Sequence, residues 1–170
     1  MRRNFGSSRA TSFLPIARRH GARLTLHGDA ALAKACGSDG FHLSAGSDPA
    51  ASRALLGPGK LIGVSVHTVT EAGAIDPRVV NYAVAGPAFE TPSKPGYGPE
   101  IGHKGLAEIA TAAPVPVLAI GGLNATRAAE VLAAGPVGIA VMGSIMRAVD
   151  PAQEMRALLA IVAGAHPRAR

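Results

Sequence analysis

Short apolar runs alternate along the chain with alanine-rich stretches, and this alternation constrains the fold more than any other feature. Most of the runs are apolar on both faces, which is typical of strands buried between helices in a parallel sheet. The pattern therefore predicts an α/β protein. The predicted strands cover residues 23–26, 40–43, 61–64, 79–85, 117–120 and 138–141, and the predicted helices cover 29–36, 48–56, 70–74, 104–112, 126–134 and 151–162.

Residues at the predicted helix ends agree with this assignment. Asp48-Pro49 and Asp150-Pro151 each combine an N-cap residue with a proline at the first helical position. Gly37 and Gly135 follow predicted helices, where glycine commonly ends a helix.

The segments ACGSDGFHL and AAGPVGIAV share one pattern of helix end, glycine, turn, glycine and strand. This echo indicates a repeated βα unit, which builds either a doubly wound sheet or a TIM (β/α)8 barrel. The sequence contains six such units, whereas a closed barrel needs eight. An incomplete barrel is therefore one of the two expected architectures.

Composition narrows the classes of function. The 170-residue chain is 48% hydrophobic, enough for one domain with a packed core, and its single cysteine excludes an intramolecular disulfide and a cysteine-only zinc site. The net charge is +6, but the arginines crowd the two ends without interleaved aromatic residues, so we expect no nucleic-acid partner. A basic surface suits a phosphorylated small molecule. With no apolar stretch of ~18 to 20 residues and no apolar secretory region, we expect no membrane partner and a cytoplasmic location.

The stretch AIGGLNATRAAEVLAAGPVGIAVMGSIM, residues 119–146, places two glycines after one predicted strand and a Gly-Ser pair after the next. Glycine lets the backbone approach a ligand closely, and consecutive N–H groups at a helix start favour an anion. We interpret the two loops as parts of one phosphate site. Two ordinary tight turns are the alternative.

The segments GVSVHT, GPAFETPSKPGYGP, AIGGL and IAVMGSIM have an order and spacing that resemble the thiamine phosphate synthase/TenI family, from about Ala22 to Val162. The resemblance implies a TIM (β/α)8-type barrel, N-terminally truncated to about six βα units. It divides the chain into a basic N-terminal segment with a remnant helix (residues 1–21), the barrel domain (22–163) and a basic tail (164–170). Parallel edges left open by such a truncation need a cover. The N-terminal segment or a homo-oligomer partner would supply it.

The resemblance also assigns roles to individual residues. Gly122 and the amides of Met142 and Gly143 would hold thiazole phosphate, in the loops after strands 7 and 8 of the family's barrel. In the FETPSK segment, Thr91 and Ser93 would contact the thiazole, and Lys94 would stabilise the leaving diphosphate as a compact positive charge. Ser65 would lie near the pyrimidine, with Lys94 and Ser65 as the catalytic pair. His67 and Thr68 are expected to cap the following helix.

Three departures from the family pattern bear on the chemistry. The Asn-Asp pair that helps to hold Mg²⁺ reads His27-Gly28, and the second magnesium aspartate aligns with Ser47. Asp29 and Asp48 stand one place further on and would be the replacement ligands, but both also have the position of helix N-caps. The Gln-x-Arg-x-Lys stretch that grips diphosphate has no counterpart.

For an isomerase of the TenI type, a general acid or base is needed. The histidine that related isomerases use is Pro87 here, which leaves His27, His103 and Glu90 as replacements.

Three functions therefore remain open. The first is a transferase that couples thiazole phosphate with pyrimidine diphosphate, giving thiamine phosphate and diphosphate with Mg²⁺. The second is a non-catalytic or TenI-like protein that binds or tautomerises thiazole phosphate. The third is another TIM-barrel enzyme that acts on a phosphorylated ligand.

Overall fold

The computed structural model describes residues 5–91, 96 and 98–165, with side chains from residue 12 onward. In these residues the chain forms six strands and eight helices, which group into two compact units. The first unit comprises the chain up to Val64 together with Pro77–Tyr82, and the second comprises Ser65–Asp76 together with the chain from Ala83. Within each unit neighbouring strands run parallel, as predicted for an α/β protein built from βα units.

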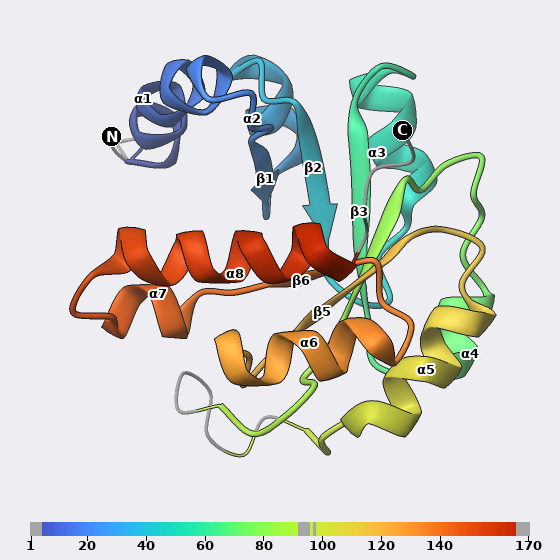
Figure 1. Ribbon diagram of the computed structural model, residues 1–170. Helices are drawn as coiled ribbons and strands as arrows, with labels where there is room; N and C mark the ends of the chain where they lie inside the picture. The colour runs from blue at the N-terminus through green and yellow to red at the C-terminus, as the bar shows by residue number, and fades with distance from the viewer. Residues whose placement is uncertain (1–4, 92–95, 97, 166–170) are drawn as a thin grey trace, which may run out of the picture. The chain divides into compact units, whose positions relative to one another are not determined.

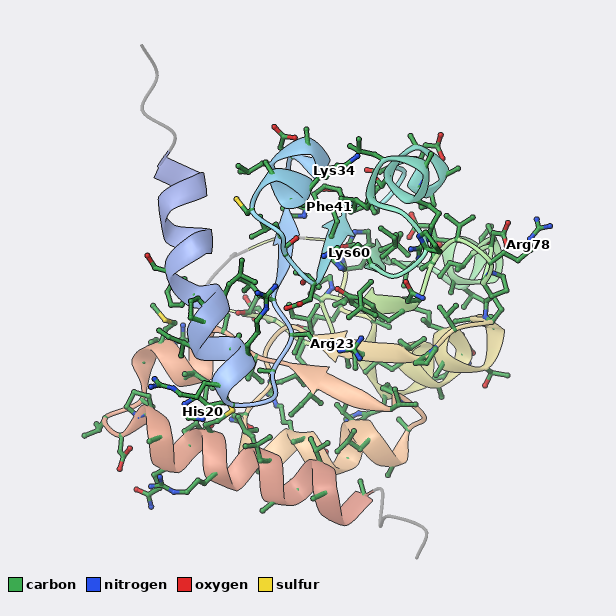
Figure 2. The ribbon with its side chains drawn as sticks, turned by 90° about the horizontal axis from the view of Figure 1, so that it is seen from above. His20, Arg23, Lys34, Phe41, Lys60 and Arg78 are labelled. Carbon is green, nitrogen blue, oxygen red and sulfur yellow. The ribbon has the colours of Figure 1, made fainter. Side chains whose placement is uncertain are left out.

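The first unit contains three consecutive strands, each reached through a helix. Leu26, Phe41 and Ile62 lie side by side in the register of the three strands, and Phe41 and Ile62 are buried. Figure 2 shows Phe41 on the middle strand, with Lys34 on α2 and Lys60 in the connection that leads into β3. The elements are α1 (Phe5–Arg19), β1 (Thr25–His27), α2 (Ala30–Ala35), β2 (Gly40–Leu43), α3 (Pro49–Leu56) and β3 (Leu61–Val66).

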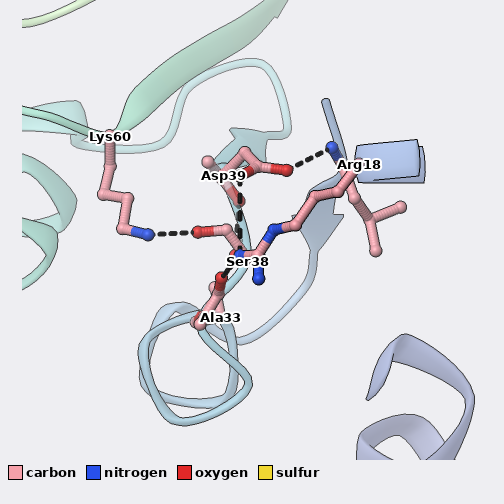
Figure 3. Close-up of polar contacts among 8 residues, drawn as sticks. Arg18, Ala33, Ser38, Asp39 and Lys60 are labelled. Carbon is pink, nitrogen blue, oxygen red and sulfur yellow. Dashed lines mark hydrogen bonds and ion pairs between the residues drawn. The ribbon is translucent and has the colours of Figure 1, made fainter. Parts of the chain in front are cut away.

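Polar side chains fix the chain where it enters these strands (Figure 3). The Asp39 carboxylate accepts a hydrogen bond from the Leu24 amide at 2.8 Å and lies 3.8 Å from the Arg18 guanidinium. The buried Ser38 hydroxyl donates to the Ala33 carbonyl at 3.0 Å, and the Lys60 ammonium donates to the Ser38 carbonyl. Backbone groups that lack a strand partner are thus satisfied by side chains.

Arg53 of α3 satisfies backbone carbonyls in the same way at the start of β3. Its guanidinium donates to the carbonyls of Gly57, Lys60 and Val79 at 2.8, 2.7 and 2.8 Å, and to Asn81 Oδ1 at 2.7 Å. Asn81 Oδ1 also accepts the Ile62 amide at 2.8 Å. One half-buried cation therefore holds together a helix end, the entry to β3 and the segment before β4.

The second unit is arranged around β5, which pairs with β4 on one side and β6 on the other. Leu106, Ile109 and Val131 are fully buried in its core, and α8 packs along α6 and against α7 (Figure 1). The elements are α4 (Val69–Gly73), β4 (Tyr82–Ala85), α5 (Gly102–Ala112), β5 (Val117–Ile120), α6 (Ala125–Ala133), β6 (Gly138–Ala140), α7 (Gly143–Arg147) and α8 (Pro151–Ala165). Tyr82 itself belongs to the first unit.

Most predicted elements are confirmed with small shifts of their ends. Strands 40–43 and 117–120 have the predicted bounds, whereas β4 begins at Tyr82 rather than at residue 79. The residues before Tyr82 bond to Arg53 and to the Ile62 amide in place of a strand ladder. The list of predicted helices contains none at residues 143–147, which form the short helix α7.

The predicted helix starts at Asp48 and Asp150 are confirmed, since both carboxylates accept backbone amides of the next turn. Thr68 caps α4 in a reciprocal pair with Glu71, also as predicted. In the described part of the chain, no helix is both long and apolar enough to cross a bilayer.

Candidate functional site

Three loops follow the carboxyl ends of β4, β5 and β6 in the second unit. Because Ala85 pairs with Ala119 and Ile120 pairs with Ala140, these loops leave adjacent parallel strands at matching positions. Adjacent strands lie about 4.8 Å apart, so loops leaving them at the same level are neighbours. The predicted adjacency of the two glycine-containing loops follows from this register.

Hydrogen bonds join the β4 loop to the β5 loop. The Ala88 amide donates to the Ile120 carbonyl at 2.7 Å, and the Phe89 amide donates to the Gly121 carbonyl at 3.2 Å. In a trans peptide the carbonyl and the next N–H point in opposite directions. The N–H groups of Gly121 and Gly122 therefore point away from the β4 loop, toward the side of β5 on which β6 lies.

This arrangement requires glycine at both positions. Gly121 and Gly122 have φ angles of 108° and 63°, which residues other than glycine rarely adopt. A Cβ atom on Gly122 would lie 2.6 Å from the Glu90 carbonyl oxygen and 2.8 Å from Phe89 Cβ. The two loops touch through their backbones, with no room for a methyl group between them.

The β6 loop contributes the start of α7. Met142 is the N-cap residue, with its side chain largely exposed, and Gly143 is the first helical residue. Amides in the first turn of a helix have no acceptor within the helix. Among the described residues, Ser144 Oγ is the one buried side-chain polar atom without a hydrogen-bond partner. Buried hydroxyls are nearly always paired, so the Ser144 hydroxyl is a candidate donor to a polar ligand in this loop.

Of the four other residues predicted to contact the substrates, the structure describes two. Ser65 lies half-buried in β3, on the same face of the strand as Gly63, and Thr91 is half-buried at the end of the β4 loop. Ser93 and Lys94 lie outside the described residues.

Two of the residues considered for a general acid or base, His103 and Glu90, lie in the second unit. His103 lies in α5, 3.4 Å from the Glu130 carboxylate and 5.0 Å from the Phe89 ring. Glu90 is exposed. At the start of α4, Thr68 provides the cap and the His67 amide donates to the Glu71 carboxylate, while the His67 ring Nδ1 is bonded to the Gly86 carbonyl.

His27 lies in the first unit, at the end of β1. Its Nδ1 is 2.8 Å from the His42 carbonyl oxygen, and its ring lies 6.1 Å from the ring of His42. His42 in turn contacts Tyr82, whose hydroxyl is 3.3 Å from His42 Nδ1. Gly63 makes room for this contact, since a Cβ there would lie 2.1 Å from Tyr82 Cζ. His27 is thus one end of a row of three rings.

The buried position of His42, and secondarily the nearby His27, lowers the pKa of His42 below 6.5. The unfolded chain then takes up this proton at a higher pH than the folded chain. The resulting stability is present above about pH 6.5 and is lost as the pH falls through the lowered pKa of the folded state. We expect the urea midpoint to fall between pH 7.5 and pH 5.5 more steeply for the natural chain than for His42→Gln. Equal slopes for the two proteins would contradict this.

The two candidate magnesium ligands act as helix caps. Asp29 Oδ1 accepts the amides of Ala31 and Leu32 at 2.8 and 3.1 Å, and Asp48 Oδ1 accepts the Ala50 amide at 2.8 Å. Across the ranges that the structure describes, no three His, Cys, Asp or Glu side chains come together as metal ligands. The capping interpretation of Asp29 and Asp48 is therefore confirmed, and their role as metal ligands stays a prediction.

The sequence interpretation missed two residues that shape the loops of the second unit, Phe89 and Arg127, and it gave no separate role to the hydroxyl of Ser144. Ser144 stands in the same Gly-Ser pair as Gly143, so its position was a usable signal. Phe89 and Arg127 carried no local signal, because their contact joins residues far apart in the sequence.

Comparisons with known proteins agree with the predicted resemblance. The profile of the family described as thiamine monophosphate synthase matches residues 7–145. The chain is 41% identical over 155 residues to the thiamine-phosphate synthase of Roseiflexus sp. (strain RS-1), covering 91% of this chain and 66% of that protein. It therefore spans about two thirds of the length of that relative.

Solved structures give the same result for the fold. The thiamine phosphate pyrophosphorylase from Pyrococcus furiosus superimposes with a TM-score of 0.82 at 29% identity, covering 94% of this chain and 76% of that one. A 3-hexulose-6-phosphate synthase superimposes with a TM-score of 0.68 at 22% identity, which shows a shared fold alone. The predicted TIM-type arrangement of βα units is confirmed by these likenesses. By sequence and by fold, the chain belongs to the thiamine monophosphate synthase family.

Proposed function

We propose that this chain binds thiazole phosphate between its β5 and β6 loops and couples it to a pyrimidine diphosphate. The names of its relatives, a thiamine-phosphate synthase and a thiamine phosphate pyrophosphorylase, support thiamine phosphate as the product. The observation that carries the proposal is the buried, unpartnered hydroxyl of Ser144 at the start of α7. It stands in the loop next to the one whose Gly121 and Gly122 amides point toward β6.

A phosphate group suits this set of donors. Its oxygens accept several hydrogen bonds at once, and the set contains the amides of Gly122, Met142 and Gly143 and the Ser144 hydroxyl. Hydrogen bonds to a charged acceptor are shorter and stronger than those between neutral groups.

In the proposed reaction the thiazole nitrogen attacks the methylene carbon of the pyrimidine. A carbon–nitrogen bond forms as the carbon–oxygen bond to diphosphate breaks, and diphosphate leaves with the electron pair. Thr91 and Ser93 would orient the thiazole, and Lys94 would stabilise the charge that develops on the leaving group. Ser65, half-buried in β3, would contact the pyrimidine. A cytoplasmic location and an oligomer that covers open strand edges belong to the same proposal.

The proposal assigns no binding site to magnesium. The family generally uses Mg²⁺, but the described residues do not gather a ligand set, and Asp29 and Asp48 are engaged as caps. No step of the proposal passes through the metal.

The same observation favours a second candidate, in which the chain binds thiazole phosphate without coupling it or tautomerises it as TenI proteins do. A protein of this kind needs the phosphate site but no diphosphate grip.

A turnover assay separates the two. The full chain is incubated with thiazole phosphate, pyrimidine diphosphate and Mg²⁺, and thiamine phosphate and diphosphate are measured together. Equal amounts of both products are expected from the synthase. Binding of thiazole phosphate without products would favour the second candidate, and neither binding nor products would overturn both.

The variant Ser144→Ala tests the observation directly. We expect affinity for thiazole phosphate to fall about tenfold, the effect of one hydrogen bond to a charged group. The ligand-free protein should be as stable as before or more so, because the substitution removes an unpartnered buried hydroxyl. Calorimetric titration and urea unfolding measure the two effects. Unchanged affinity would contradict a phosphate at this position.

A further inference from the structure

Three successive carbonyls at the end of β5 and in its loop, those of Ile120, Gly121 and Gly122, each accept a hydrogen bond. The backbone amides of Ala88 and Phe89 donate hydrogen bonds to the carbonyls of Ile120 and Gly121, respectively. The third carbonyl, that of Gly122, accepts a hydrogen bond from Arg127 Nη1 at 3.0 Å. This last contact is made by a side chain, so it depends on the identity of a single residue.

The Gly122 carbonyl sets the direction of the next amide. Gly122 has a positive φ of 63°, and the peptide that joins it to Leu123 is trans. Because carbonyl and N–H are antiparallel in a trans peptide, holding the Gly122 oxygen toward Arg127 turns the Leu123 N–H the other way. Arg127 therefore fixes the plane of the peptide that immediately follows Gly122.

Arg127 is itself held in place from two sides. Its backbone amide donates to Asn124 Oδ1 at 3.1 Å, at the start of α6. Its guanidinium lies 4.8 Å from the centre of the Phe89 ring, a distance suited to a cation–π contact. The Phe89 ring also lies 5.0 Å from the ring of His103. Phe89, which stands two residues before Thr91 in the β4 loop, thus supports the Arg127 guanidinium.

We propose that Arg127 is a positioning residue: by holding the Gly122 carbonyl it restrains the loop that presents the Gly122 amide to the phosphate, with Phe89 as its platform. The inference rests on the proposed function, since it concerns the same phosphate site. Arg127 acts here through the backbone of the β5 loop. The positive charge of Arg127 would also attract a phosphate directly. The experiment below distinguishes this attraction from the effect on the loop backbone.

Three probes are titrated into the full chain by calorimetry: inorganic phosphate, thiazole phosphate and the unphosphorylated thiazole alcohol. For Arg127→Ala we expect about a tenfold loss of affinity for both phosphate probes, as for one hydrogen bond from a charged donor. The affinity for the alcohol should not change. Arg156→Ala, which removes an exposed arginine from α8, is the matched control and should bind all three probes as the natural chain does.

Phe89→Leu separates orientation from charge, because it keeps Arg127 but removes its platform. We expect it to weaken phosphate binding severalfold, and the double variant Phe89→Leu/Arg127→Ala to lose no more than Arg127→Ala alone, because both changes act through one contact. The loss for Arg127→Ala should persist at 1 M salt, where charges separated by more than about 3 Å are screened in solvent.

Full affinity in Phe89→Leu, with a loss in Arg127→Ala that disappears at high salt, would overturn the positioning role. So would wild-type affinity in Arg127→Ala. Urea unfolding of every variant shows whether it is folded. If the natural chain binds neither phosphate probe, the proposed function fails before the variants are compared, which distinguishes the two failures.

Discussion

Gly122→Ala is expected to abolish measurable binding of thiazole phosphate, a loss of at least about 100-fold. The new Cβ would lie 2.6 Å from the Glu90 carbonyl oxygen and 2.8 Å from Phe89 Cβ, and backbone atoms cannot move as cheaply as a side chain. The φ of 63° adds strain of its own. The β5 loop must therefore move away from the β4 loop, and the amides that hold the phosphate move with it.

Gly21→Ala is the matched control for this variant. Gly21 also has a positive φ, of 67°, but nothing lies within 4 Å of the place where its Cβ would be. Both variants should lose some stability in urea unfolding, and only Gly122→Ala should lose the ligand. Retained affinity in Gly122→Ala would contradict the assignment of the phosphate to this loop.

Arg53→Ala is expected to have the largest effect on stability, about 3 kcal/mol of unfolding free energy. The substitution leaves the carbonyls of Gly57, Lys60 and Val79 without their donor, and it frees Asn81 from its position beside the Ile62 amide. Each group left unsatisfied in a half-buried place costs on the order of 1 kcal/mol or more.

Urea unfolding with Arg53→Lys and Arg19→Ala as companions tests this account. Lysine offers one compact ammonium in place of a planar fork, so Arg53→Lys should recover only part of the loss. Arg19→Ala removes an exposed arginine from α1 and should leave the midpoint nearly unchanged. A midpoint for Arg53→Ala within error of that for Arg19→Ala would show that the hydrogen bonds of Arg53 contribute little.

Local sequence signals predicted the βα units well. The strands around Phe41 and Ala119 were found because their apolar runs are bounded by glycine and proline turns, and Asp48 was found because an N-cap beside proline is a local motif. The short helix α7 has no apolar period to recognise. The late start of β4 depends on Arg53, which is 26 residues from Val79 in the sequence, and no local rule contains that contact.

The candidate site was predictable to the same extent. The glycines of the β5 loop stand directly after an apolar strand, so their close approach to another backbone could be anticipated from the sequence. The partners that make them necessary, Phe89 and Glu90, come from a different loop and depend on the pairing of β4 with β5. The unsatisfied Ser144 hydroxyl is a property of packing in three dimensions.

The most direct test of the central idea, a phosphate held between the β5 and β6 loops, is a calorimetric comparison of thiazole phosphate with the unphosphorylated thiazole alcohol on the natural chain. Several hydrogen bonds to a charged group predict that the phosphate ester binds at least about 100-fold more tightly than the alcohol. The difference should shrink in Ser144→Ala and vanish in Gly122→Ala. Equal affinities for the ester and the alcohol in the natural chain would contradict the account.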